Sequence, residues 1–221
     1  GCVPQERLKE HYSALEESRA DLVALYFIAD SKLVQMGLIP AQDHDDIIRA
    51  EYEGYARTPL VQLRRMREGT SIEEDHMRNR QMIIHWLMAN TKAIEKRDRG
   101  GKVFYVMTDV ALFREGVGRL LAEVQRIKAE GDFVAAKRLF DRHGIHFDPK
   151  LRDQVIERVK ATNPPSYTGF VMPRLQAVQN PTGAITDVTI SYPRNLTTQM
   201  LEFAAATKAS RLAAISFCRY S

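Results

Sequence analysis

The sequence predicts a mainly α-helical protein that ends in a β-hairpin and a C-terminal helix. Apolar residues recur with the 3.6-residue period of a helix, most clearly between residues 109 and 127. Several segments also begin with residues that commonly cap helices. After Asn163-Pro164-Pro165 the composition changes to β-branched and aromatic residues, which favour strands. We therefore expect a helical domain over residues 1–162 and a second part over residues 163–221.

The first long helix is predicted between about residues 14 and 36. Ser13 and Glu16 have the spacing of a capping box, in which two side chains satisfy the free backbone N–H groups of a helix start. The apolar residues lie on more than one face of this helix, so we expect it to be buried. Gly37 and Pro40 follow it as a C-terminal stop.

Two further helices are predicted before residue 70. Asp43 or Asp46 would cap the first of them, and Pro59 would open the second, because proline is favoured in a first helical turn. Gly69 would end the second helix.

A long helix followed by a strand is predicted next. Ser71 and Glu74 form a second capping box, from which a helix would run to about residue 95. The stretch 92–102 is rich in basic residues but also carries acids, and we interpret it as a solvated helix end. Residues 103–106 are β-branched and aromatic, which predicts a short strand.

Three helices are predicted to complete the helical domain. Asp109 would begin the first, whose apolar residues keep a helical period. Asp132 follows a glycine and would cap a helix to Phe140. Pro149 would open a helix that runs to about Ala161.

The C-terminal part is predicted to form a hairpin and a helix. Residues 167–178 and 184–192 read as strands separated by a turn of four or five residues. A lone hairpin is marginally stable in water, so we expect it to join a sheet in the intact protein. Asn195 would cap a helix over residues 196–207, and residues 209–221 receive no assignment.

Composition and charge exclude two classes of partner. The 221 residues carry a formal net charge of +4. The basic residues are interleaved with acids, so we expect no nucleic-acid partner, which would require a concentrated basic stripe. No apolar run approaches eighteen residues, and we expect no membrane partner. Cys2 and Cys218 fit no zinc or redox spacing, and so few cysteines favour a reducing, cytoplasmic location.

An acidic segment opens the apolar part of the first helix. Its sequence is Glu16-Glu17-Ser18-Arg19-Ala20-Asp21. Glu17 and Asp21 are four residues apart and share a helix face. Carboxylates near a helix start are also favoured by the positive end of the helix dipole, so the pattern by itself is open to a structural explanation.

This segment and a second one resemble the dipeptidyl peptidase III family of zinc metallopeptidases. The acidic segment is similar to the family's second zinc motif, and residues 74–80 are similar to its His-Met-x-x-Arg segment. The resemblance implies that Glu17 is a protein ligand of Zn²⁺. It implies that Glu16 and Asp21 are second-shell partners that orient the zinc-binding histidines.

The second segment implies two catalytic residues, His76 and Arg80. By resemblance, His76 would donate a hydrogen bond to the tetrahedral intermediate of peptide hydrolysis. Arg80, four residues later on the same helix face, would hold a substrate carbonyl or stabilise developing charge. Without the resemblance, His76 reads as an exposed histidine paired with Asp75 or Glu73.

The family's first zinc motif, His-Glu-x-x-Gly-His, is absent from this sequence. None of the six histidines stands in such a frame; they are residues 11, 44, 76, 85, 143 and 146. We therefore expect this chain to be the C-terminal portion of a larger enzyme and to be inactive alone. The missing N-terminal part of the same protein would then be its partner.

The resemblance implies an enzyme built from a helical lobe and a second lobe that contains a β-barrel. It would be a zinc aminopeptidase that releases N-terminal dipeptides from short peptide substrates. Zinc would polarise the scissile carbonyl, and a glutamate of the missing motif would activate the bound water. Tyr167, placed where the lobes meet, is a candidate substrate-binding residue. The alternative is a helical interaction or scaffolding domain without catalysis.

Overall fold

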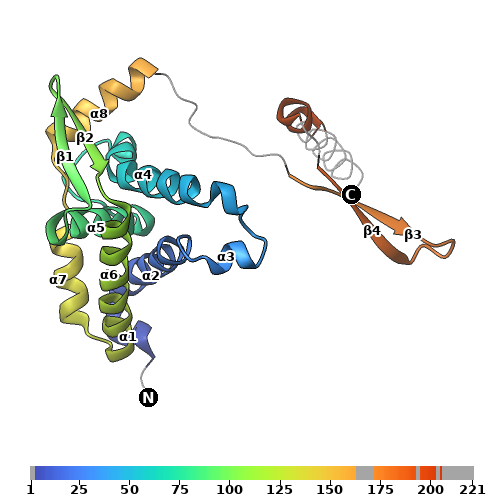
Figure 1. Cartoon of the computed structure of the whole chain (residues 1–221), viewed down its shortest axis with the longest axis horizontal. Helices are drawn as coiled ribbons and strands as arrows, with labels where there is room; N and C mark the ends of the chain where they lie inside the picture. Colours follow the sequence, from blue (N-terminus) through green and yellow to red (C-terminus); the bar gives the residue numbers. More distant parts are fainter. Residues whose placement is uncertain (1–2, 163–171, 193–194, 203–204, 206–221) are drawn as a thin grey trace, which may run out of the picture. The chain divides into compact units, whose positions relative to one another are not determined.

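Helices make up most of the computed structural model, which describes residues 3–162, 172–192, 195–202 and 205 (Figure 1). The predicted mainly α fold with a C-terminal hairpin and helix is confirmed. The chain divides into two units, Gly1–Asn163 and Pro164–Ser221.

The first unit contains eight α-helices and one hairpin among its described residues. The helices are α1 (Pro4–Leu8), α2 (Tyr12–Phe27), α3 (Lys32–Gln35), α4 (His44–Gln62), α5 (Asp75–Asn90), α6 (Val110–Glu130), α7 (Phe133–His143) and α8 (Pro149–Thr162). The strands are β1 (Ile94–Arg99) and β2 (Lys102–Met107).

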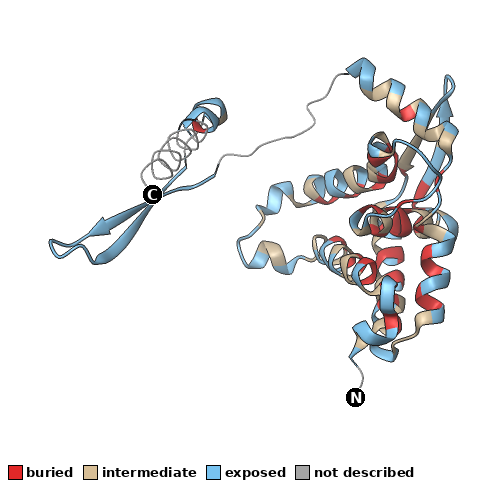
Figure 2. Ribbon diagram, turned by 180° about the vertical axis from the view of Figure 1, so that it is seen from behind, coloured by how far each residue is buried: buried red, intermediate tan, exposed pale blue. Residues whose placement is uncertain are grey.

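The core of this unit lies where α2 packs against α5 and α6 (Figure 2). Tyr52 of α4 adds to it: its ring stacks on Phe113 of α6 with centroids 4.2 Å apart. Its hydroxyl donates a hydrogen bond of 2.9 Å to the backbone oxygen of Leu25 on α2. A fully buried tyrosine thus keeps its polar atom satisfied while its ring fills the core.

The predicted helix over residues 14–36 is wrong in its extent. The structure forms two separate helices there, α2 and the short α3. Ser13 does not cap α2, because the residue that precedes the helix is His11 and its side chain makes no capping hydrogen bond. A turn of 3₁₀ helix over Lys9–His11 leads directly into α2 instead.

The predicted break at Pro59 is also wrong, since Pro59 lies inside α4. Proline lacks a backbone N–H and usually interrupts a helix. Here Ala56 and Leu60 on either side of it are buried against the rest of the unit. Their packing holds the helix continuous through residue 62.

The helix predicted to start at the second capping box begins at Asp75. Glu74 is its N-cap, and the Glu74 carboxylate accepts hydrogen bonds from the backbone N–H groups of His76 and Met77, at 3.1 and 2.8 Å. The helix ends at Asn90, earlier than predicted, because Thr91 adopts an extended backbone with φ −138° and ψ 175°.

Part of the stretch interpreted as a solvated helix end is a strand. β1 pairs antiparallel with β2, so residues 94–99 are not helical, whereas the strand predicted at 103–106 is confirmed. Gly100 and Gly101 have φ values of 60° and 74° and form the two-residue turn between the strands. Glycine reaches positive φ without steric cost, which permits this tight hairpin.

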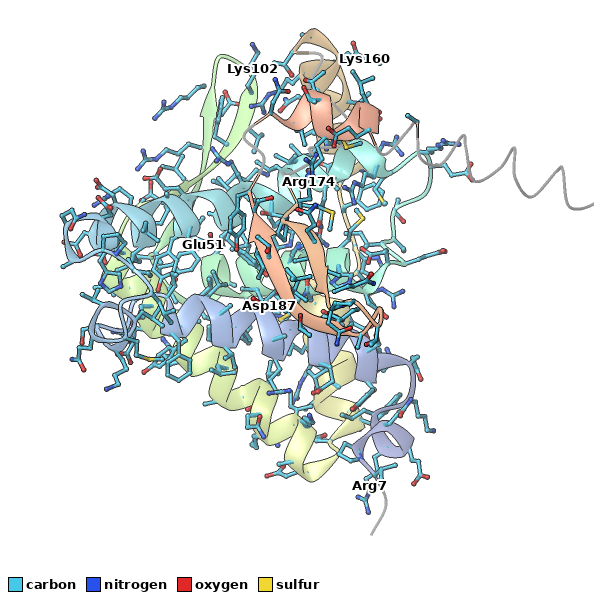
Figure 3. The ribbon with its side chains drawn as sticks, turned by 90° about the vertical axis from the view of Figure 1, so that its right-hand side faces the viewer. Arg7, Glu51, Lys102, Lys160, Arg174 and Asp187 are labelled. Carbon is cyan, nitrogen blue, oxygen red and sulfur yellow. The ribbon has the colours of Figure 1, made fainter. Side chains whose placement is uncertain are left out.

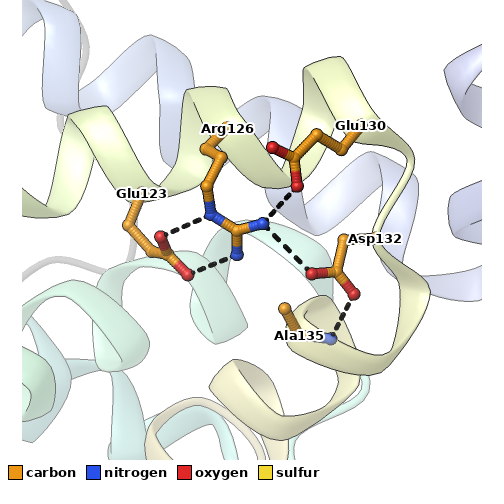
Figure 4. A network of polar contacts seen from close by, with 5 residues as sticks. All are labelled: Glu123, Arg126, Glu130, Asp132 and Ala135. Atoms are coloured by element: carbon orange, nitrogen blue, oxygen red, sulfur yellow. Dashed lines mark hydrogen bonds and ion pairs between the residues drawn. The ribbon is translucent and has the colours of Figure 1, made fainter.

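The predicted caps of α6 and α7 are confirmed. Asp109 accepts a hydrogen bond from the backbone N–H of Leu112, and Asp132 accepts one from Ala135. Asp132 also pairs with Arg126, whose guanidinium contacts Glu123 and Glu130 as well (Figure 4). The hydrogen bonds that Arg126 donates to these three carboxylates raise its pKa, so the guanidinium at this junction between α6 and α7 stays charged.

The second unit contains strands β3 (Arg174–Gln179) and β4 (Ile185–Ser191) and a helix over residues 196–202. The strands pair antiparallel with each other, and every residue in them is exposed. Asn195 caps the helix as predicted, since its side-chain oxygen accepts a 3.0 Å hydrogen bond from Thr198 N–H. Tyr167 and residues 209–221 lie outside the described residues.

None of the helices in the described part of the chain is long and apolar enough to cross a membrane.

Two helical glycines offer a matched test of this packing. A Cβ at Gly116 would lie 2.5 Å from Leu87 and 2.8 Å from Thr91, whereas a Cβ at Gly54 would meet nothing within 4 Å. We expect Gly116→Ala to lower the free energy of unfolding by about 1 kcal/mol or more, because overpacking outweighs the gain in helix propensity. Gly54→Ala should raise it by about 0.5–1 kcal/mol. Urea unfolding of the two variants measures both; a stabilised Gly116→Ala protein would contradict the packing.

Candidate functional site

Helices α2 and α5 bring the predicted metal and catalytic residues together. Nδ1 of His76, in the first turn of α5, lies 3.2 Å from Oε2 of Glu17 on α2. His76 is half exposed and Glu17 is about one-third exposed, so both groups are open to a ligand. His76 is exposed, as the alternative interpretation expected, but among the described residues it pairs with Glu17 and not with Asp75 or Glu73.

Asp21, one helical turn after Glu17, joins three helices. Its Oδ2 accepts a 2.7 Å hydrogen bond from the Tyr55 hydroxyl on α4 and a 3.1 Å hydrogen bond from the Asn79 amide on α5. Burial and the neighbouring Asp21 carboxylate raise the pKa of Tyr55 well above its usual value. Tyr55 therefore remains a hydrogen-bond donor to Asp21.

Asn79 is completely buried, and its amide is only half satisfied. Its nitrogen donates a hydrogen bond to Asp21, while its oxygen Oδ1 has no hydrogen-bond partner within the described residues. A buried acceptor without a partner is uncommon. Neither Asn79 nor Tyr55 was identified from the sequence. Asn79 lies within the His-Met-x-x-Arg segment, and that position could have marked it as a site residue.

Arg80 and Asp21 line the same cavity. The cavity has a volume of about 400 Å³ and is lined by Asp21, Glu51, Gly54, Tyr55, Thr58 and Arg80. Glu51 belongs to α4 (Figure 3). His76 and Arg80 are four residues apart on α5, so their backbones are separated by one helical turn of about 6 Å.

Glu16 faces a different neighbour from Glu17. Its carboxylate lies 2.7 Å from Nζ of Lys128 on α6 and 3.3 Å from Nε of Arg19. Partial burial opposes the shift, but hydrogen bonds from Lys128 and Arg19 lower the pKa of Glu16. Glu16 thus joins α2 to α6 as a carboxylate, and its predicted role of orienting a zinc-binding histidine stays a prediction.

Within the described residues, Glu17 and its neighbours do not by themselves make up a full set of zinc ligands. A catalytic zinc takes three protein ligands and leaves one position open. Among the residues that the structure describes, no three His, Cys, Asp or Glu side chains gather so as to hold a metal ion. Glu17 and His76 offer one carboxylate and one imidazole, which is an incomplete set.

Comparison with known families identifies the chain. The family model for peptidase family M49 matches residues 3–168, which include every residue of the candidate site described in this subsection. This chain belongs to peptidase family M49. Comparison with curated proteins found no match.

Membership of family M49 identifies the chain as a peptidase, and thus a hydrolase, of the dipeptidyl peptidase III type. Members of this family are generally metallopeptidases. The predicted family is thereby confirmed. The roles of Glu16, Glu17, Asp21, His76 and Arg80 stay predictions, for which the geometry gives positions only.

The contacts of Asp21 predict a stability difference within one helix. Asp21→Ala in the 221-residue chain should lower the free energy of unfolding by about 1–3 kcal/mol, because Tyr55 and buried Asn79 lose their acceptor. Glu17→Ala, one turn earlier, removes only a partly exposed pair and should cost about 1 kcal/mol or less. Urea unfolding at neutral pH measures both values.

Asp21→Asn serves as the conservative control, since it keeps an oxygen acceptor in the same place. It should recover part of the loss. Equal stabilities of Asp21→Ala and Glu17→Ala would show that the contacts of Asp21 do not hold the three helices together.

Proposed function

We propose that this M49 chain supplies the helices that face the substrate in a zinc-dependent dipeptidyl aminopeptidase. The enzyme releases N-terminal dipeptides from short peptides and acts in the cytoplasm. The contact between His76 and Glu17 supports the proposal, because it joins the two family segments at 3.2 Å across two helices. Family membership favours this enzyme over a scaffolding domain.

Glu17 acts in this proposal as one zinc ligand, and the remaining ligands come from residues outside this sequence. Glu16 and Asp21 orient the ligand histidines. Asp21 has the capacity to do so: both of its hydrogen bonds within the described residues go to Oδ2. Its Oδ1 can accept an imidazole N–H, which fixes the tautomer of a metal ligand.

His76 stabilises the oxyanion that forms when the peptide carbonyl is attacked. Its Nδ1 lies 3.2 Å from Glu17, which leaves the other ring nitrogen, Nε2, to donate a hydrogen bond to the substrate oxygen. Arg80, one turn further along α5, holds a substrate carbonyl. Tyr167 stays a proposed substrate contact outside the described residues.

The metal assignment predicts a difference between two glutamates. In the intact enzyme, Glu17→Ala should strongly reduce zinc content and peptidase activity, because one of three protein ligands is lost. Glu16→Gln should reduce affinity or activity about 10- to 100-fold, as changes beside a ligand usually do. Glu6→Ala, an exposed glutamate of α1, is the control. Metal analysis and dipeptidyl-naphthylamide turnover give both readouts.

The 221-residue chain alone should show neither tight zinc binding nor turnover in the same assays. Unchanged zinc content in the Glu17→Ala enzyme would remove Glu17 from the metal site. Turnover by the highly purified chain alone would refute the proposal that further residues complete the site.

The two catalytic residues are expected to differ kinetically. His76→Ala should lower kcat about 100- to 1000-fold with little change in zinc content or KM, since the lost hydrogen bond exists mainly in the transition state. Arg80→Ala should also raise KM, because Arg80 contacts bound substrate. His146→Ala, an exposed histidine elsewhere, is the matched control. Wild-type kcat in the His76→Ala enzyme would return this residue to an ordinary surface histidine.

A further inference from the structure

A second cavity next to the candidate site is lined by four arginines. Arg57 comes from α4, Arg64 and Arg65 from the 3₁₀ turn Leu63–Arg65 that follows it, and Arg80 from α5. The cavity has a volume of about 230 Å³. Its other lining residues are Gly54, Thr58, Val61 and Gln62, so no carboxylate takes part.

These four guanidinium groups lack protein partners within the described part of the chain. None of them donates a side-chain hydrogen bond or forms an ion pair with a described residue. Arg126, in contrast, contacts three carboxylates. Four arginines around one small cavity make its surroundings positive, which favours an anion as its ligand.

The basic cavity borders the acidic cavity of the candidate site. Arg80, Gly54 and Thr58 line both this cavity and the one that contains Asp21 and Glu51. The two cavities are therefore neighbours, acidic on the side of Asp21 and basic on the side of Arg64. Arg80 lies about 6 Å from His76 along α5. An extended peptide rises about 3.3 Å per residue, so a carboxylate two to three residues from the reacting bond reaches the arginines.

We propose that Arg57, Arg64 and Arg65 form a subsite, bordered by Arg80, that binds a carboxylate of the peptide substrate. The proposal rests on the proposed peptidase function and adds a specificity to it. The carboxylate belongs either to the C-terminus of a short peptide or to an Asp or Glu side chain. Arginine suits this task, since its planar guanidinium can donate two parallel hydrogen bonds to one carboxylate.

Binding to the 221-residue chain tests the subsite independently of turnover. Fluorescence anisotropy would compare three labelled pentapeptides of one sequence: a free C-terminal carboxylate, a C-terminal amide, and the amide with Glu in place of Gln at one internal position. We expect the free carboxylate to bind about three- to tenfold more tightly than the amide. Recovery of affinity by the Glu peptide would identify a side-chain carboxylate as an equal ligand, and no recovery would restrict the subsite to the C-terminus.

Arg64→Gln and Arg65→Gln should each remove most of this preference, and the double variant all of it. Arg67→Gln deletes the same charge just beyond the cavity lining and is the matched control. The preference should also vanish at about 1 M salt, where charges are screened within about 3 Å. This second measurement uses the unmodified chain and does not depend on the folding of any variant.

Equal binding of carboxylate and amide peptides at low salt, or an equal loss in Arg67→Gln, would overturn the subsite. Peptidase activity is measured separately in the intact enzyme. Carboxylate selectivity without turnover would leave the subsite standing and remove the proposed function. Turnover of carboxylate and amide peptides with the same kcat/KM, in both the wild-type and the Arg64→Gln enzyme, would support the proposed peptidase function and remove the subsite.

Discussion

The position of the candidate site depends on the hydrogen bonds that Asp21 accepts. Tyr55 of α4 and Asn79 of α5 both donate to the same carboxylate oxygen on α2. These bonds fix the register of three helices within one turn of Glu17 and His76. Charged hydrogen bonds of this kind are roughly twice as strong as neutral ones, and here they are partly shielded from water. The distance between Glu17 and His76 is thus set by regular helices, which hold functional groups more precisely than loops do.

Neighbouring residues of the acidic segment contact different helices. Successive positions on a helix point in directions about 100° apart. Glu16 therefore reaches Lys128 of α6, while Glu17 reaches His76 of α5. Asp21 returns to the face of Glu17 and contacts α4 and α5. The six residues 16–21, about one and a half helical turns, thus contact three other helices. The core next to them is apolar.

Features with a local physical cause could be predicted from the sequence. The period of α6 and the caps Asp109 and Asp132 depend on residues within a few positions of each other. The helix break expected at Pro59 failed because burial of Ala56 and Leu60 outweighs the local preference of proline. β1 was missed because its sequence, IEKRDR, has little strand propensity; its pairing with β2 across Gly100-Gly101 decides its structure. The same limit applies to the site: the two family segments could be recognised, but the contact of Tyr55 with Asp21 and the cavity shared by Arg80 and Arg57 join parts of the chain that are distant in sequence.

The apolar core of the helical unit is continuous, although no group of three metal-binding side chains gathers among the described residues. A small domain that needs a metal to fold has few apolar residues to bury. Here Leu15, Leu22, Ile84, Phe113 and many others form a continuous core without any metal ligand among them. The helices are joined further by the hydrogen bonds of Tyr52 and Asp21. Glu17 and His76 consequently lie at fixed positions on a preformed surface. Binding of a ligand at these preformed positions does not have to order the two helices as well, which lowers its entropic cost.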